Sequence, residues 1–362
     1  MRRLKGLESA MMNDDVGRAK TMQHTRSRQR GGAIKSFLLW IAGLSFLAAA
    51  GLAGGGYLAY RAAQSQGPAS TNTLMLFESG SSVARIAPEL KDAGVIEYAE
   101  LFTATVRVRG VQGKIKAGEY DIPAYASVMD IIDLLIDGKS IQHFITAPEG
   151  ITTAQILLLI EANETLTGEV TLEPAEGALL PETYAFTRGE TRDGVLRRMM
   201  AAQDAVIEDL WDGRANELPF STPDEALVLA SIVEKETALP EERDRIAAVF
   251  VNRLKRGMRL ESDPTIIYGL TKGEPLGRGL RQSELRSETA YNTYIIHGLP
   301  PTPIANAGRA AIEAVLNPAD TDDIFFVADG TGGHAFAKTL REHQRNVAAW
   351  RRIERDRNAQ GG

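Results

Sequence analysis

The sequence predicts an α+β protein in three parts: one transmembrane helix, a small α+β module and a larger mixed α+β domain. An uncharged apolar run over residues 36–60 indicates the first part, and repeated helix signals alternating with short extended stretches indicate the other two. With 362 residues, 44 % of them hydrophobic and 24 % charged, the chain has room for about two soluble domains. It has no cysteine, which excludes disulfides and thiolate metal sites.

The apolar run SFLLWIAGLSFLAAAGLAGGGYLAY lies between Lys35 and Arg61 and contains no charged residue. As a helix it reaches roughly 37 Å, enough to cross a hydrocarbon core of about 30 Å with some tilt. A cleaved signal peptide is the alternative, but its apolar core is only about 7 to 15 residues long and follows a short leader. Here residues 1–35 come first. We therefore expect an uncleaved transmembrane helix over residues 36–60.

Residues 1–35 form a basic leader, with nine Arg or Lys and three acidic residues. Because positive flanks stay in the cytoplasm, we expect a single-pass protein of the inner (plasma) membrane whose N-terminus is cytoplasmic. Everything from residue 61 onward is then periplasmic. The whole chain carries a net charge of −6 despite this basic leader, so the outer portion is acidic. Such a surface offers no patch for phosphates, and nucleic acid is not an expected partner.

A linker is expected at residues 61–72, where small and polar residues dominate. Three capped amphipathic helices follow, each with a Ser or Thr before apolar residues spaced by three and then four. They begin after Ser82, Ser127 and Thr152. Short extended pieces, LMLF at 74–77 and FITA at 144–147, precede the first and third helices. Small α+β units of this kind are often binding modules, although the periodicity is equally compatible with packed helices that bind nothing.

A buried helix is predicted to begin near Pro223. Thr222 is a typical N-cap, Pro223 suits the first helical position, and Glu225 completes a capping box. The segment LVLASIV that follows is apolar nearly all round and ends in two acids, Glu234 and Glu236. Two residues apart on a helix, these acids point in different directions. Burial against apolar surface raises the pKa of a carboxyl group, so either acid is a candidate proton donor.

Each glutamate has a plainer interpretation, as a helix-end acid paired with Arg243 or Arg245. Spacing alone does not decide between this structural role and that of a proton donor. The polar loops expected at 261–270, 289–308 and 325–336 favour a functional acid. They combine Asn, Tyr, Thr and Asp with proline, which suits a sugar-binding cleft with hydrogen-bonding groups and stacking faces. After Glu234 and Glu236, and before the first of these loops, the pattern of residues 240–257 predicts an amphipathic helix that ends at Gly257.

Several segments in order closely resemble the endolytic murein transglycosylases, the YceG-like or MltG-like family. They are GALLPETYAF (177–186), ASIVEKET (230–237), FVNRLKRGMRLESDPT (250–265), AYNTY (290–294), GLPPTPIANAG (298–308) and FVADGTGGHAF (326–336). The likeness covers about residues 74–350. It implies a LysM-like α+β module over 73–146 and a catalytic domain over 147–356, behind the transmembrane anchor.

The resemblance also implies an activity: cleavage of peptidoglycan glycan strands between N-acetylmuramic acid and N-acetylglucosamine, within the strand, to leave 1,6-anhydro ends. The catalytic acid of that family falls on Glu236, and neither a metal nor a cofactor is implied. The substrate-side residues that we expect are Asp263, Thr265, Tyr291, Asn292 and Tyr294. Glu234 is then structural. Penicillin-binding proteins, which polymerise glycan, are the implied partners beside the membrane and the glycan strands.

Two other hypotheses belong to different classes. One is a non-catalytic peptidoglycan-binding scaffold, for which replacing Glu236 would change nothing. The other is a cytoplasmic pyridoxal-phosphate lyase, which the expected anchor orientation disfavours. The segment GTGGHA (330–335) resembles a dinucleotide motif but lacks the helix and second strand that such a fold needs, so we expect a hairpin turn. His334 and His343 are too far apart, with no third ligand, to indicate a metal site.

Overall fold

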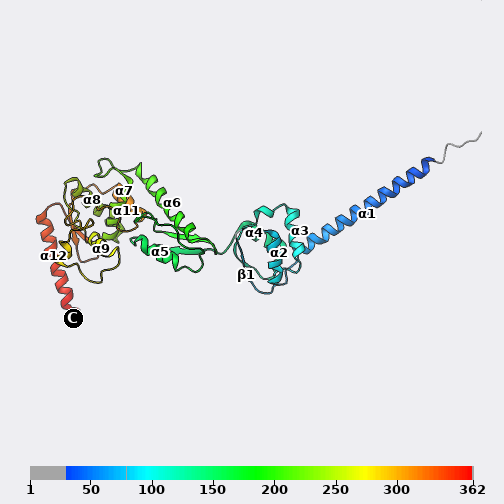
Figure 1. The fold of residues 1–362 in the computed structure, drawn as a ribbon, viewed down its shortest axis with the longest axis horizontal. Helices are drawn as coiled ribbons and strands as arrows, with labels where there is room; N and C mark the ends of the chain where they lie inside the picture. Colours follow the sequence, from blue (N-terminus) through cyan, green and yellow to red (C-terminus); the bar gives the residue numbers. More distant parts are fainter. Residues whose placement is uncertain (1–29, 79, 361–362) are drawn as a thin grey trace, which may run out of the picture. The chain divides into compact units, whose positions relative to one another are not determined.

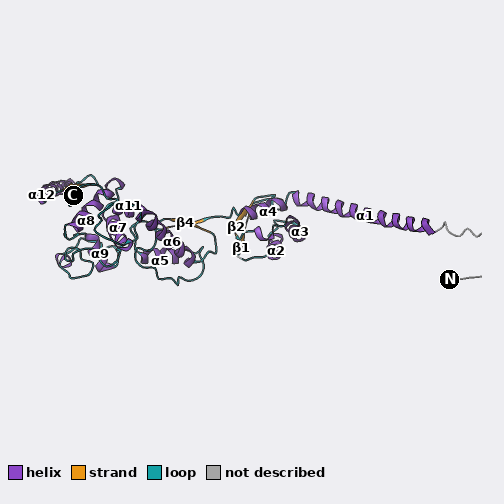
Figure 2. Ribbon diagram, turned by 90° about the horizontal axis from the view of Figure 1, so that it is seen from above, coloured by secondary structure: helices purple, strands orange, loops and turns teal. Residues whose placement is uncertain are grey.

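The computed structural model describes residues 30–78 and 80–360. The chain forms two compact units, Met1–Ser65 and Gln66–Gly362, and each is described by itself. Most of the expected basic leader, residues 1–29, lies outside the described residues. Figure 2 shows helices and loops with few strands, so the described part is a mixed α+β structure.

The first unit contains one long helix, α1 (Arg30–Gln64). Its segment Lys35–Gln64 is long and apolar enough to cross a membrane. The helix is longer than the apolar run alone, because residues 30–35 precede the run and the first four residues of the expected linker, 61–64, continue it. The described chain therefore contains one candidate membrane span, at the place where the sequence predicts it.

The second unit begins with a small α+β region. It contains β1 (Thr73–Phe77), α2 (Val83–Asp92), α3 (Ala99–Arg109), the short 3₁₀ helix η1 (Gln112–Lys114), β2 (Gly118–Ile122) and α4 (Val128–Asp137). Strands β1 and β2 are antiparallel, with Thr73 opposite Ile122 and Phe77 opposite Gly118. Figure 1 shows α2, α3 and α4 gathered beside β1. The helices predicted after Ser82 and Ser127 are confirmed, and α3 is an additional one.

The caps of these helices differ in strength. Ser127 forms a complete capping box with Asp130, and Thr152 forms one with Gln155 at the start of α5 (Thr153–Glu161). Ser82 precedes α2 in an extended conformation, but its side chain makes no capping hydrogen bond. Helix α2 therefore depends on its buried face, formed by Ile86, Ala87 and Leu90, more than on its cap.

The chain continues into a second antiparallel pair, β3 (His143–Thr146) with β4 (Thr183–Phe186), and then α6 (Arg192–Trp211). Helices α5 and α6 pack against this strand pair. The apolar cluster that they bury includes Ile156, Ile160, Val195, Leu196 and Phe186. The extended piece predicted just upstream of the third capped helix is confirmed as β3.

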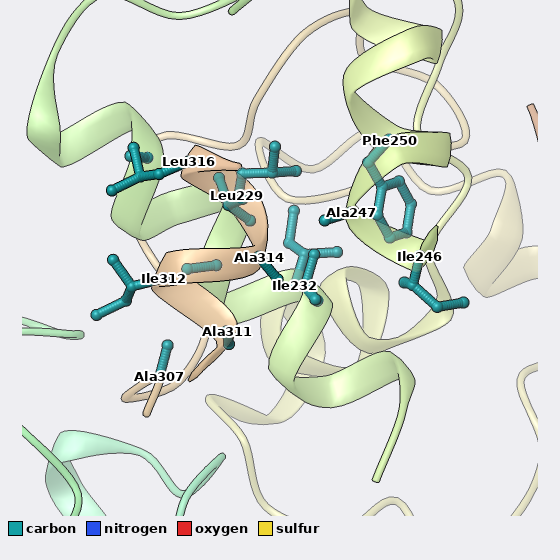
Figure 3. Packing of buried hydrophobic residues seen from close by; sticks show 14 of the residues in the cluster. Leu229, Ile232, Ile246, Ala247, Phe250, Ala307, Ala311, Ile312, Ala314 and Leu316 are labelled. Carbon is teal, nitrogen blue, oxygen red and sulfur yellow. The ribbon is translucent and has the colours of Figure 1, made fainter. Parts of the chain in front are cut away.

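The main core lies around three helices, α7 (Pro223–Glu236), α8 (Pro240–Lys255) and α11 (Arg309–Leu316). Figure 3 shows Leu229 and Ile232 of α7 between Ala247 and Phe250 of α8 and the small residues of α11. Each of the labelled side chains is almost completely buried. Burying a Leu, Ile or Phe side chain stabilises a fold by about 1.5–3 kcal/mol, so this cluster holds α7 firmly in place.

The structure corrects two loop predictions. Residues 325–336, expected as a loop, are mostly the two strands of a hairpin. Residues 261–270 were expected as a loop, but Asp263–Thr271 form helix α9, which starts with Asp263 and Pro264 in its first turn. Proline is favoured there because its missing N–H has no helical partner. Only Glu261 and Ser262 remain outside the helix. The short helix α10 (Gln282–Leu285) and the irregular segment 286–308 follow.

The final region is a hairpin and a helix. Strands β5 (Phe325–Ala328) and β6 (His334–Ala337) are antiparallel, and α12 (Leu340–Gln360) follows them. The glycine-rich segment at 330–333 is the turn between the strands, as predicted. A hairpin has no helix at this point to receive a dinucleotide phosphate, so the resemblance of GTGGHA to a nucleotide motif has no structural counterpart.

Candidate active site

Helix α7 carries the candidate acid at its last residue. Thr222 and Glu225 form the predicted capping box, and Pro223 occupies the first turn. The helix ends at Glu236 because Thr237 turns to an extended conformation, with φ −142° and ψ 135°. The buried body of α7 therefore delivers Glu236 to a point where the chain leaves the core. This carboxyl group is half-buried.

The environment of Glu236 favours a protonated carboxyl group. Burial raises its pKa to about 7, opposed by a hydrogen bond from Ser262 and reinforced by the negative charge of Asp263. The hydroxyl Oγ of Ser262 donates to Glu236 Oε1 at 2.5 Å. Glu236 forms no salt bridge with any residue in the described ranges; Arg245, one predicted alternative partner, pairs with Asp323 at 2.7 Å. A carboxyl group with this pKa can give and accept a proton near neutral pH.

Ser262 is aimed at Glu236 by a strained turn. Glu261 adopts a left-handed conformation with φ 54°, which costs a residue with a side chain about 1–2 kcal/mol. Arg253 holds this turn: its Nη1 donates to the carbonyl oxygens of Arg259 and Leu260 and to Glu261 Oε2 at 3.0 Å. Strain retained beside a buried carboxyl group is typical of functional sites.

Thr265 supports Ser262 from behind. It is fully buried, and its hydroxyl donates to the Ser262 carbonyl oxygen at 2.7 Å. Thr265 and Thr293 share a hydrogen bond of 2.8 Å, and the Ser262 N–H donates to Thr293 Oγ1 at 3.0 Å. The structure therefore places Thr265 one layer below the surface of the site.

Asp263 and Tyr294 meet on the Glu236 side of α9. The Tyr294 hydroxyl donates to Asp263 Oδ1 at 2.8 Å. Burial, and then this bond, raises the pKa of the Tyr294 phenol, so the ring keeps its proton. Asp263 lies close enough to Glu236 to influence its ionisation. The structure thus brings three predicted residues together: Glu236, Asp263 and Tyr294.

Asn292 and Tyr291 lie elsewhere on this segment. Asn292 is 0 % exposed, and its amide donates to the Ser287 carbonyl oxygen at 2.7 Å while its Oδ1 accepts from the Tyr294 N–H at 3.1 Å. It therefore holds the loop that carries Tyr294. The Tyr291 hydroxyl shares a hydrogen bond with Thr302 at 2.8 Å, and its ring packs edge-on against Tyr268 of α9 at 5.0 Å. Its contacts are near the C-terminal end of α9, whereas Asp263 begins that helix.

Glu234 points to a different neighbour. Its Oε2 accepts the backbone N–H of Gly308 at 3.0 Å, at the start of α11. Burial raises its pKa, and the Gly308 N–H opposes this effect. A carboxylate at a helix N-terminus is favourable because it meets free N–H groups and the positive end of the helix dipole. Glu234 thus fastens α11 to α7.

Three residues contribute to the site without having been predicted to do so. Ser262 was part of a recognised motif but had no assigned role, and its place beside Asp263 was the available signal. His334 was considered only as a metal ligand, yet its charge affects the ionisation of Glu236. Asn306 is 0 % exposed and accepts the Leu179 N–H at 3.0 Å, which ties two of the recognised segments together. Over residues 30–78 and 80–360, no group of three potential metal ligands occurs.

The part of the chain that matches known proteins includes the sequence segments described above. The YceG-like family matches residues 76–349, most of the chain. The chain belongs to the YceG-like family. Two relatives are named endolytic murein transglycosylase. The one from Bacillus subtilis (strain 168) is 32 % identical and aligns with 74 % of this chain and 81 % of its own length. The one from Streptococcus pneumoniae (strain D39) is 29 % identical over 87 % of this chain but only 65 % of its own length.

A crystal structure of a yceG-like protein from Listeria monocytogenes is 29 % identical in sequence. It covers 76 % of this chain and 98 % of that chain, with a TM-score of 0.48. The family match over residues 76–349 confirms, at the level of the family, the likeness that the sequence motifs indicated.

Proposed function

We propose that this chain is an endolytic murein transglycosylase that cleaves the bond between N-acetylmuramic acid and N-acetylglucosamine within glycan strands. Membership of the YceG-like family and the two relatives with that name support the activity. The observation that carries the proposal for this chain is Glu236: a half-buried carboxyl group with a pKa of about 7 at the end of a rigid helix.

One carboxyl group is enough for the reaction. Protonated Glu236 donates its proton to the glycosidic oxygen as the bond from that oxygen to the anomeric carbon breaks. The resulting carboxylate then takes the proton of the muramic acid 6-hydroxyl, whose oxygen forms the new bond to the same carbon. The proton count balances without water, and the product has a 1,6-anhydro end. Glycosidases that use two carboxyl groups need the second at a set distance, which this route does not require.

Among the other predicted residues, we propose Asp263 and Tyr294 as the substrate-side groups nearest the reacting bond. Their support is the hydrogen bond of 2.8 Å between them and their place beside Glu236. Tyr291 is proposed as a more distant sugar contact, because it is half-buried and stands beside Tyr268. Asn292 and Thr265, both fully buried, are proposed to keep the cleft in shape and not to touch the sugar.

The domain plan remains our proposal: basic leader 1–35, transmembrane helix 36–60, linker 61–72, LysM-like glycan-binding module 73–146 and catalytic domain 147–356. The basic residues before α1 support a cytoplasmic N-terminus and a periplasmic catalytic domain. In that position the enzyme would release or terminate nascent strands beside penicillin-binding proteins.

The test is digestion of purified peptidoglycan glycan strands by the full-length protein in detergent, with product ends identified by mass spectrometry. Wild type and Glu234→Gln should both produce anhydro-muropeptides. Glu236→Gln should be slower by a factor on the order of 10²–10⁴, the usual contribution of a general acid. Reducing ends would instead indicate a hydrolase. No cleavage by wild type would favour the non-catalytic scaffold.

A further inference from the structure

His334 begins strand β6, directly after the turn of the β5–β6 hairpin. The turn is well ordered by its own hydrogen bonds: Asp329 Oδ1 accepts from the Thr331 N–H at 2.7 Å, and the Asp329 N–H donates to the Gly333 carbonyl oxygen at 2.9 Å. The imidazole packs edge-on against Phe326 with ring centres 5.3 Å apart. Its side chain is 18 % exposed. The ring is therefore held in one orientation and still reaches solvent.

Glu242 grips His334 at two points. Its Oε1 accepts the His334 backbone N–H at 2.8 Å, and its Oε2 bonds ring Nδ1 at 2.7 Å. The turn packs closely on Glu242 and Leu239, because a Cβ atom added at Gly333 would lie 2.6 Å from Glu242 Oε1 and 3.5 Å from Leu239. Glu242 stands in the first turn of α8, six positions after Glu236. The hairpin turn thus packs on the short connection that follows the candidate acid.

This arrangement leaves one ring nitrogen available. With Nδ1 donating to an ionised Glu242, Nε2 is free to accept or, when the ring is charged, to donate. Nε2 makes no hydrogen bond within the described part of the chain, and it is not among the buried polar atoms without a partner, so solvent reaches it. A carboxylate-oriented imidazole with an open second nitrogen is a recurring component of catalytic sites.

Few charged groups surround the Glu236 carboxyl group and the His334 imidazole. The charged groups that act on the pKa of Glu236 are Asp263 of α9, Arg253 of α8 and His334 of β6. Burial dominates and raises the pKa of Glu236, Asp263 acts in the same direction, and the positive charges of His334 and Arg253 lower it. His334 itself pairs with Glu242, and its charge lowers the pKa of Glu236 and of Asp329. Arg253 is engaged by three carbonyl oxygens and Glu261. These bonds use Nε and Nη1 of Arg253, whereas the Nε2 atom of His334 makes no hydrogen bond within the described residues.

We propose that His334, oriented by Glu242, is a positioning residue of the glycan-cleaving site whose Nε2 supports the Glu236 carboxylate between the two halves of the reaction. The inference rests on the proposed function. After the glycosidic oxygen has taken its proton, Glu236 is left as a half-buried anion that must wait for the 6-hydroxyl. When it carries a proton on both ring nitrogens, the imidazole stabilises that state, and the proton count is unchanged because His334 neither gains nor loses a proton overall.

The test compares His334→Asn with His334→Gln in full-length protein. The Asn amide lies near the position of Nδ1 and can keep the bond to Glu242, whereas the Gln amide reaches the position of Nε2. We expect both variants to lose kcat on the order of tenfold to a hundredfold with little change in KM. Gln should be the more active of the two. In both, the alkaline fall of kcat should move to higher pH, since a positive charge near Glu236 is gone.

A purely structural role for His334 predicts the opposite order, with Asn more active than Gln and the wild-type pH profile in both; that result would overturn the inference. If both variants unfold in thermal melts, Glu242→Gln decides, because it leaves the imidazole in place and removes its orienting charge. Lower kcat with a shifted pH profile would support the inference, and wild-type kinetics would reject it. His343→Asn is the matched control, since His343 stacks on Phe325 of the same hairpin at 4.9 Å, and it should keep the wild-type pH profile.

Wild-type digestion separates this inference from the proposed function. If wild type produces no anhydro ends, the proposed function fails, and the inference about His334 fails with it. If wild type produces them and the Asn variant equals or exceeds the Gln variant, only the role of His334 fails.

Discussion

The last turn of α7 carries a glutamate on each of two faces, and the two glutamates have different roles. Glu234 and Glu236 are both half-buried, and burial raises the pKa of both. Glu234 accepts a backbone N–H at the start of α11, and Lys235 beside it donates to the Gly150 carbonyl oxygen at 2.9 Å. Glu236 accepts a serine hydroxyl at 2.5 Å. A backbone partner fastens elements together, whereas a hydroxyl partner and a nearby acid leave a carboxyl group able to exchange its proton.

The largest difference between the two faces should appear in stability against pH. Because the folded state keeps the Glu236 proton up to about pH 7 while the unfolded chain releases it near 4.5, stability falls as pH rises between these values. The loss is at most about 3 kcal/mol and persists above pH 7. Glu236→Gln has no proton to lose. Its thermal unfolding should therefore match wild type at pH 4.5 and exceed it at pH 8; equal curves at pH 8 would show that Glu236 ionises normally.

Removing the hydroxyl partner should weaken the Glu236 face without unfolding it. Ser262→Ala deletes a hydrogen bond to a group that becomes charged during the reaction, a kind worth about 1.5–3 kcal/mol. We expect kcat to fall by about tenfold to a hundredfold. The alkaline fall should move to higher pH, because the Ser262 bond lowers the pKa of Glu236. Ser221→Ala, at an exposed serine before α7, is the control and should behave as wild type.

A feature of α7 can be predicted from the sequence when the residues that cause it are neighbours in the chain, and not when they are far apart. The start of α7 follows from Thr222, Pro223 and Glu225, which are adjacent and form the capping box that the structure contains. The role of Glu236 came from a family motif. Its partner Ser262 is 26 positions away, and only the tertiary fold makes them neighbours. The same holds for Glu242 and His334, which are 92 positions apart.

Helix α9 shows where local patterns mislead. Its sequence DPTIIYGLT contains proline, β-branched residues and glycine, which favour loop or strand over helix. Packing decides otherwise: a Cβ at Gly269 would lie 3.1 Å from Tyr291, so the glycine allows α9 to approach that segment. Tertiary contacts thus override the weak helix propensity of the segment.

A smaller effect is expected from the tyrosine on the Glu236 face. Tyr294→Phe keeps the ring and removes only the hydroxyl that donates to Asp263 at 2.8 Å. A single such bond corresponds to about threefold to tenfold in kcat. Steady-state kinetics on defined glycan strands would detect this change. An unchanged kcat would mean that Asp263 needs no partner, and would limit the chemistry to Glu236 and Ser262.

The smallest effect on activity should come from the Glu234 face. Glu234→Ala removes the acceptor for the Gly308 N–H, which should cost about 1 kcal/mol of stability, as the loss of a helix cap does. Cleavage by the folded protein should stay within about threefold of wild type. Thr222→Ala, at the other end of α7, should behave alike. If Glu234→Ala instead abolished cleavage in a folded protein, the division between the two faces would be wrong.

The most direct test of Glu236 as the single acid and base is the pH dependence of kcat for the wild-type protein between pH 4 and 9. The chemistry needs a protonated carboxyl group at the start, so kcat should fall with an apparent pKa of about 7. A rate that stays level to pH 9, or one that already falls near pH 4.5, would contradict the assignment of Glu236 as the proton donor.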